Sequence, residues 1–170
     1  MKPQDVVVLT ALLSKPSKGR ESVAVLAGRS GLSASETHAS LKRLKEARLI
    51  DETDDKPWKG AVMEFLAHGL RYAFPVRPGG IAYGLPTGYS APPLNGKFAA
   101  SSMAWVWPWE GGDKKGESIR PLYATVPRIC AKDPVLWEWL SLLDALRAGA
   151  VRERRAALKE LELRLGVPAS

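Results

Sequence analysis

The chain has 170 residues, of which 45% are hydrophobic and 25% charged, values typical of a globular protein long enough to bury a core. No apolar run approaches the roughly 18 residues of a membrane span, and the short N-terminal apolar run, flanked by Asp5, favours an amphipathic helix over a signal peptide. The only cysteine, Cys130, can form no internal disulfide, which is typical of a reducing cytoplasm.

The net charge of +7 is unevenly distributed along the chain. Residues 1–50 carry nine Lys/Arg and four Asp/Glu (+5), residues 51–110 five and six (−1), and residues 111–170 eleven and eight (+3). The basic first third predicts a polyanionic partner for that part of the chain.

Three helices are predicted in the first 50 residues. Residues 4–14 and 21–29 each carry apolar side chains at helical spacing, and a loop with helix breakers separates them. After a tight turn, Ser33 is placed to N-cap a third helix that ends near Arg48. Glu36 follows Ser33 by three residues and completes a capping box.

The middle of the chain predicts a helix and a hairpin. Residues 51–55, DETDD, are interpreted as a solvated acidic linker, and 57–69 predict a helix with proline in its first turn. Apolar side chains alternate on both sides of an RPGG turn, which predicts a β-hairpin over residues 71–86 with Arg77 at its tip.

The second half gives clear patterns only near its end. Residues 87–132 form an irregular region rich in Gly, Pro and Trp, for which the sequence assigns no regular element. Residues 133–170 predict a helical region with Asp133 as its first N-cap and a break at Gly149.

The segment SVAVLAGRSGLSASETHASLKRLKEARLI, residues 22–50, resembles the helix-turn-helix core of winged-helix bacterial regulators of the MarR type. The likeness rests on the Leu-Ala pair, the SGLS turn and LKRLKEARLI, and it covers about the first third of the chain. It implies that the helix over residues 33–47 enters the major groove of duplex DNA.

The resemblance implies a set of DNA-contacting residues. Ser35, Glu36, His38, Ala39 and Lys42 are expected to face the groove from a helix capped by Ser33, with Arg43 and Lys45 nearer the phosphates and Arg20 and Ser22 at the start of the preceding helix. The groove-facing residues differ from those of a recognition helix with strong base contacts, because the first half of this helix has no Arg, Asn or Gln for a bidentate base contact. Readout is therefore expected to depend on Ser, His, water and DNA shape.

The wing of such a regulator is harder to place. Four carboxylates within residues 51–55 would repel phosphates, so the hairpin over 71–86, with Arg71 and Arg77, is interpreted as a displaced wing. The alternative is that this hairpin belongs to a separate α+β domain. The expected fold class is α+β and mainly helical: a winged helix-turn-helix with an extra helix before the wing (residues 1–86), the irregular region, and a C-terminal helical region for dimerisation or partner binding.

Trp105, Trp107 and Trp109 alternate along the irregular region. They either form a core under a long loop or provide a candidate partner-binding surface, because tryptophan is enriched at binding hot spots. The last helix either dimerises or packs on its own chain. More faintly, residues 71–165 resemble regulators encoded beside nucleotidyltransferase-type toxins, which implies an antitoxin-like repressor with a toxin partner.

The sequence gives no indication of catalysis. No nucleophile-elbow or paired-carboxylate pattern is present, and His38, His68 and Cys130 match no metal-ligand spacing, so neither an enzyme nor a cofactor or metal is expected. The principal hypothesis is a cytoplasmic, homodimeric transcriptional regulator, a repressor that binds double-stranded DNA and no membrane. The alternative is a protein-binding antitoxin or adaptor that sequesters a partner through its Trp-rich C-terminal region.

Overall fold

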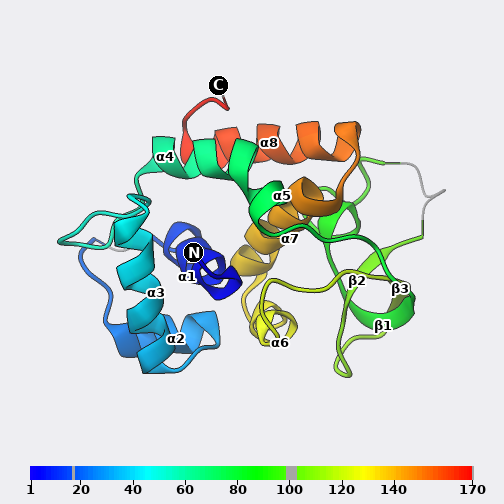
Figure 1. Ribbon diagram of the computed structural model, residues 1–170. Helices are drawn as coiled ribbons and strands as arrows, with labels where there is room; N and C mark the ends of the chain where they lie inside the picture. The colour runs from blue at the N-terminus through cyan, green and yellow to red at the C-terminus, as the bar shows by residue number, and fades with distance from the viewer. Residues whose placement is uncertain (17, 99–102, 170) are drawn as a thin grey trace.

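The computed structural model describes residues 1–16, 18–98 and 103–169 (Figure 1). The first half contains α1 (Pro3–Ser14), α2 (Val23–Ser30), α3 (Ala34–Glu46), α4 (Lys59–Glu64), the π-helical turn η1 (Phe65–Gly69) and α5 (Leu70–Ala73). The second half contains β1 (Ile81–Pro86), the 3₁₀ turn η2 (Gly88–Ser90), β2 (Trp105–Pro108), β3 (Lys114–Ser118), α6 (Val126–Cys130), α7 (Pro134–Ala148) and α8 (Val151–Leu165). The expected α+β, mainly helical class is confirmed. Within the described ranges, no helix has the length and apolarity needed to cross a membrane.

The turn between α2 and α3 follows from local side chains and one glycine. Gly31 ends α2 in the left-handed region (φ 67°), and a Cβ there would lie 2.6 Å from Thr125 Oγ1, so only glycine fits. The predicted capping box then begins α3: Ser33 Oγ accepts from the Glu36 N–H (3.2 Å), and Glu36 accepts from the Ser33 N–H (3.0 Å).

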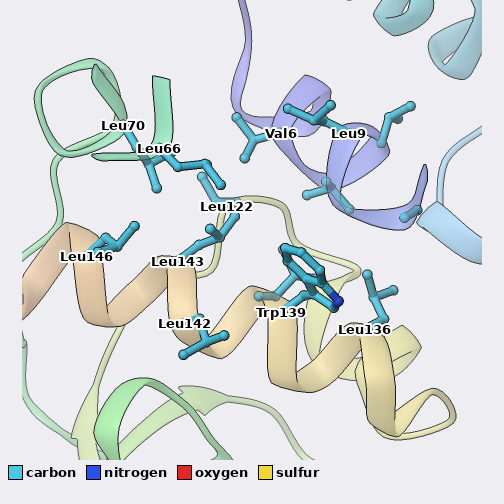
Figure 2. Packing of buried hydrophobic residues seen from close by; sticks show 14 of the residues in the cluster. Val6, Leu9, Leu66, Leu70, Leu122, Leu136, Trp139, Leu142, Leu143 and Leu146 are labelled. Atoms are coloured by element: carbon cyan, nitrogen blue, oxygen red, sulfur yellow. The ribbon is translucent and has the colours of Figure 1, made fainter. Parts of the chain in front are cut away.

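Helix α1 is buried on several sides because it packs against α2, α3 and α7. Its residues 5–11 are all buried. Figure 2 shows Val6 and Leu9 of α1 facing the α7 cluster that includes Leu136 and Trp139. One buried cluster therefore joins α1, α2 and α3 to the C-terminal helices.

The helix predicted over 57–69 begins at Lys59 and continues through η1 and α5 to Ala73. The hairpin predicted over 71–86 is therefore wrong. Its first half is the end of this helix followed by an irregular stretch, residues 74–80, because buried Leu66 and Leu70 hold the helix on the core and Pro75 and Pro78 have no N–H for strand pairing.

Strand β1 does not pair with residues 71–77, as the predicted hairpin requires, but with two later strands. It pairs antiparallel with both β2 and β3, and β2 pairs parallel with β3, so the small sheet closes on itself. Gly84 permits this closure, since a Cβ there would lie 1.8 Å from the Trp107 carbonyl oxygen. The described residues of the region 87–132, for which the sequence assigns no regular element, thus include the 3₁₀ turn η2, the strands β2 and β3 and the short helix α6.

Helix α7 is the centre of the molecule, and it begins at the predicted N-cap Asp133 and ends at Gly149. Near its end the buried carboxylate of Asp144 accepts hydrogen bonds from Trp107 Nε1 (2.6 Å), Thr87 Oγ1 (2.9 Å) and Arg147 Nη1 (2.6 Å). Burial raises the pKa of Asp144, while Arg147 and the hydrogen bonds oppose that shift. This network fixes β2 and the loop after β1 to α7.

Helix α8 packs along α7 and α4 through Ala157, Leu161 and Leu165. Its last turns lie beside α4 (Figure 1). The apolar stripe of this helix is thus buried within its own chain, while Leu163 on another side of the helix is exposed.

Candidate nucleic-acid interface

Helix α3 presents one exposed polar face to solvent. Ser35, His38 and Lys42 are exposed and follow one another at spacings of three and four residues, and Ala39 beside them is half-buried. Within the described part of the chain, none of these three side chains makes an ion pair or a side-chain hydrogen bond. The opposite face of α3 is buried through Thr37, Ser40, Leu41 and Leu44.

Glu36 lies apart from this face, contrary to its expected groove-facing position. Besides capping α3, its carboxylate accepts a hydrogen bond from the Tyr123 hydroxyl (2.9 Å). Hydrogen bonds from the Ser33 backbone and hydroxyl and from Tyr123 lower the pKa of Glu36. The carboxylate therefore fixes the first turn of α3 to the segment before α6.

Arg43 and Lys45 both have carboxylate partners inside the protein. Arg43 makes a bidentate ion pair with the fully buried Asp5, with Nη2–Oδ1 at 2.6 Å and Nε–Oδ2 at 2.8 Å. Lys45 Nζ lies 2.7 Å from Asp55 Oδ1 and donates to the Glu52 carbonyl (2.9 Å). This ion pair argues against the expected phosphate contact of Arg43, because its charge already balances a buried carboxylate.

The stretch interpreted as a linker is a short hairpin that follows α3 directly. Residues 49–58, here called the acidic hairpin, are joined by Asp51 N–H to Lys56 O (2.8 Å), Trp58 N–H to Leu49 O (2.9 Å) and a bridge between Ile50 and Pro57. These backbone pairings show that the residues interpreted as a solvated linker form an ordered hairpin. Counting the carboxylates of this segment from its sequence does not show which groups each of them bonds.

Three of the four carboxylates of this hairpin have partners. Asp51 accepts from the Thr53 hydroxyl (2.6 Å) and N–H (2.8 Å), and these bonds lower the pKa of Asp51. Asp54 pairs with Lys56, whose side chain is the main cause that lowers the pKa of Asp54. Buried Asp55 pairs with Lys45 and with Arg20 Nε (2.7 Å). Most of the negative charge therefore stabilises the turn.

The remaining predicted DNA contacts separate into two groups. Ser22 caps α2, with its Oγ accepting from the Val25 N–H (3.3 Å), and Arg20 lies close to the acidic hairpin through Asp55. In contrast, Arg71 lies on α5, and Arg77 is exposed in the stretch that joins α5 to β1; β1 lies on the other side of the molecule from α3 in Figure 1. The structure does not bring these two arginines to α3.

Two cations near α3 were missed from the sequence. Arg48 and Lys59 are exposed and line an open hollow of about 590 Å³ together with Trp58, whose side chain is 55% exposed. Both lie at the base of the acidic hairpin: Arg48 directly precedes it and Lys59 directly follows it. Recognising DETDD as a turn would have indicated them.

The tryptophans of β2 are core residues. Trp105 and Trp107 are 7% and 1% exposed, and Tyr89 packs on Trp105 with ring centroids 4.6 Å apart. The core interpretation is confirmed for these two, and their assignment to a partner-binding surface is wrong because both faces of β2 are covered. Trp109, just after the strand, is half-buried.

The part of the chain that the structure describes contains no cluster of three or more His, Cys, Asp or Glu able to hold a metal ion. Cys130 is buried, and burial raises the pKa of its thiol. No protein-family model, curated protein or solved structure matches this chain significantly.

Proposed function

We propose that residues 1–58 form a winged helix-turn-helix that binds duplex DNA as part of a transcriptional regulator, with α3 in the major groove and the acidic hairpin as a short wing. The observation that carries this proposal is the exposed face of α3, where Ser35, His38 and Lys42 have no side-chain partner among the described residues. A helix that reads base edges needs polar side chains free for the ligand on a rigid backbone.

The internal bonds of α3 supply that rigidity. Its N-terminus is fixed by the capping box and Tyr123, and its middle by the Arg43–Asp5 ion pair. Arg48 and Lys59 at the foot of the acidic hairpin supply unpaired positive charge for the phosphate backbone, replacing the predicted contact at Arg77. The wing itself contributes little attraction, because Asp51, Glu52 and Asp54 surround its turn.

The test begins with selection of bound fragments from a genomic DNA library by the purified protein, followed by fluorescence anisotropy on an enriched duplex. Lys42→Ala is expected to weaken binding about tenfold and to lower the salt slope by about 1, since one phosphate or base contact is lost. Arg77→Ala removes the same charge far from α3 and is expected to leave the affinity unchanged.

Two outcomes would contradict the proposal: no fragment is enriched, or Lys42→Ala binds the enriched duplex as tightly as the wild type. If Arg77→Ala weakens DNA binding instead, the segment around Arg77 contacts DNA, and the acidic hairpin is not the wing. The proposal includes a two-fold symmetric homodimer. The enriched fragments are therefore expected to contain pseudo-palindromic sites.

The alternative of a protein-binding antitoxin or adaptor receives less support. That alternative places the partner-binding surface on Trp105, Trp107 and Trp109, and the first two are buried. We therefore retain DNA binding as the single proposed function.

A further inference from the structure

A separate pocket of about 240 Å³ lies where η1 and α5 meet the end of α7 and the first half of α8. We call it the arginine pocket, because Arg71 of α5 and Arg154 of α8 line it together with His68 of η1. None of its lining residues belongs to α3 or to the acidic hairpin, so the pocket is distinct from the proposed DNA interface.

The arginine pocket concentrates positive charge without a counter-charge. Arg71 and Arg154 are both half-buried, and the described residues contribute no carboxylate to the lining of the pocket. In the described part of the chain neither has an ion-pair partner: Arg154 Nη1 donates only to the Gly149 carbonyl (2.7 Å), and the Arg71 guanidinium lies over the Tyr72 ring, 5.1 Å from its centroid. Other half-buried or buried arginines each have a carboxylate partner, namely Arg29, Arg43, Arg147 and Arg164.

Two partly desolvated guanidiniums that share one pocket repel each other, and an anion between them would relieve that repulsion. The π-helical turn supports a binding role, since such turns are rare and occur often at functional sites. It supplies Leu66, Ala67 and His68 to the pocket wall, and its closing bond runs from the Leu70 N–H to the Phe65 carbonyl.

We propose that the arginine pocket binds a small phosphate-bearing ligand. Forked guanidinium donors from two different helices match the several oxygens of a phosphate better than a single point charge would. The other walls, Leu146 and Leu158, are apolar, and the Tyr72 ring, 74% exposed, stands at the rim where a planar group can stack. The volume is below that of a drug-sized site, which favours a compound as small as a nucleoside monophosphate.

The proposal is tested by isothermal titration calorimetry of the full chain with AMP, inorganic pyrophosphate and adenosine at constant ionic strength. AMP and pyrophosphate are expected to bind and to raise Tm, because the ligand joins α5 to α8, whereas adenosine binds at least tenfold more weakly. Arg71→Ala is expected to weaken AMP binding about tenfold or more.

Two further variants separate a built site from general attraction. Arg155→Ala removes an exposed charge one residue from Arg154 and is expected to leave AMP binding unchanged. Ala67→Leu keeps every charge, fills the pocket and is expected to abolish AMP binding. This variant tests whether AMP occupies the pocket even if Arg71→Ala fails to fold.

Absence of AMP and pyrophosphate binding at millimolar concentrations overturns the proposal, as does equal binding of adenosine and AMP. Equal weakening by Arg71→Ala and Arg155→Ala also overturns it. If Arg71→Ala loses duplex DNA binding while AMP never binds, the pocket serves a DNA phosphate, and the small-ligand assignment is wrong.

Discussion

Replacing Asp144 with alanine is expected to lower the free energy of unfolding by about 4 kcal/mol. The substitution leaves Trp107 Nε1 and Thr87 Oγ1 buried without their acceptor. It also removes the carboxylate partner of the buried Arg147 guanidinium, whose Nε still donates to the Phe74 carbonyl (2.8 Å). An unpaired buried charge costs more than the pair contributes, and two neutral donors add to the loss. Urea unfolding followed by tryptophan fluorescence measures the change.

Two companion variants make this result specific. Asp144→Asn keeps an oxygen acceptor but no charge for Arg147, so an intermediate loss is expected. Glu138→Ala removes another carboxylate of α7, whose partner Arg164 is partly exposed, and is expected to cost less than about 1 kcal/mol. A loss of under 1 kcal/mol for Asp144→Ala would show that the network does not stabilise the fold.

The second large effect is expected at the base of the proposed reading helix. Arg43→Ala leaves the fully buried Asp5 without its partner and is expected to destabilise the protein by about 3 kcal/mol. Lys42→Ala, one residue earlier and exposed, is expected to change stability by less than about 0.5 kcal/mol. The matched pair separates a variant that loses DNA binding through the fold from one that loses it through contact.

The pH dependence of the Arg43→Ala variant gives an independent check. Burial raises the pKa of Asp5, but hydrogen bonds from Arg43, the Lys2 N–H and Ser40 outweigh it, so its pKa in the folded protein is lowered. In the wild type this stabilisation is present above about pH 4 and is lost as the pH falls through the lowered pKa. Without Arg43 burial dominates and raises the pKa of Asp5, so the deficit relative to wild type shrinks below neutral pH. Parallel stability curves from pH 7 to pH 3 would contradict this account.

Local signals in the sequence predicted the helices well. The capping box of Ser33 and Glu36, the N-cap Asp133 and the break at Gly149 are found where expected, because each depends on residues within one helical turn. The exposed face of α3 was expected from the resemblance to a helix-turn-helix. Ser35, His38 and Lys42 are exposed there as expected, whereas Glu36 lies apart from that face because it bonds Ser33 and Tyr123.

Apart from the acidic hairpin, whose pairings lie within ten residues, the errors concern pairings between distant residues. Arg43 pairs with Asp5 across 38 positions and Arg20 with Asp55 across 35, so charge counts over short windows left these cations free. The alternation in 81–86 correctly indicated a strand, but its partners begin more than twenty residues later. Register and partner choice depend on which apolar faces meet, and local alternation does not encode that.

Helix α7 has a consequence for how the chain opens. It contacts α1, α5 beside the arginine pocket, α6 and α8, and residues 139–147 are all buried. None of α1, α5, α6 and α8 can separate from α7 without uncovering part of it. Its amide hydrogens should therefore exchange with deuterium only through global unfolding, at a rate set by the whole protein's stability.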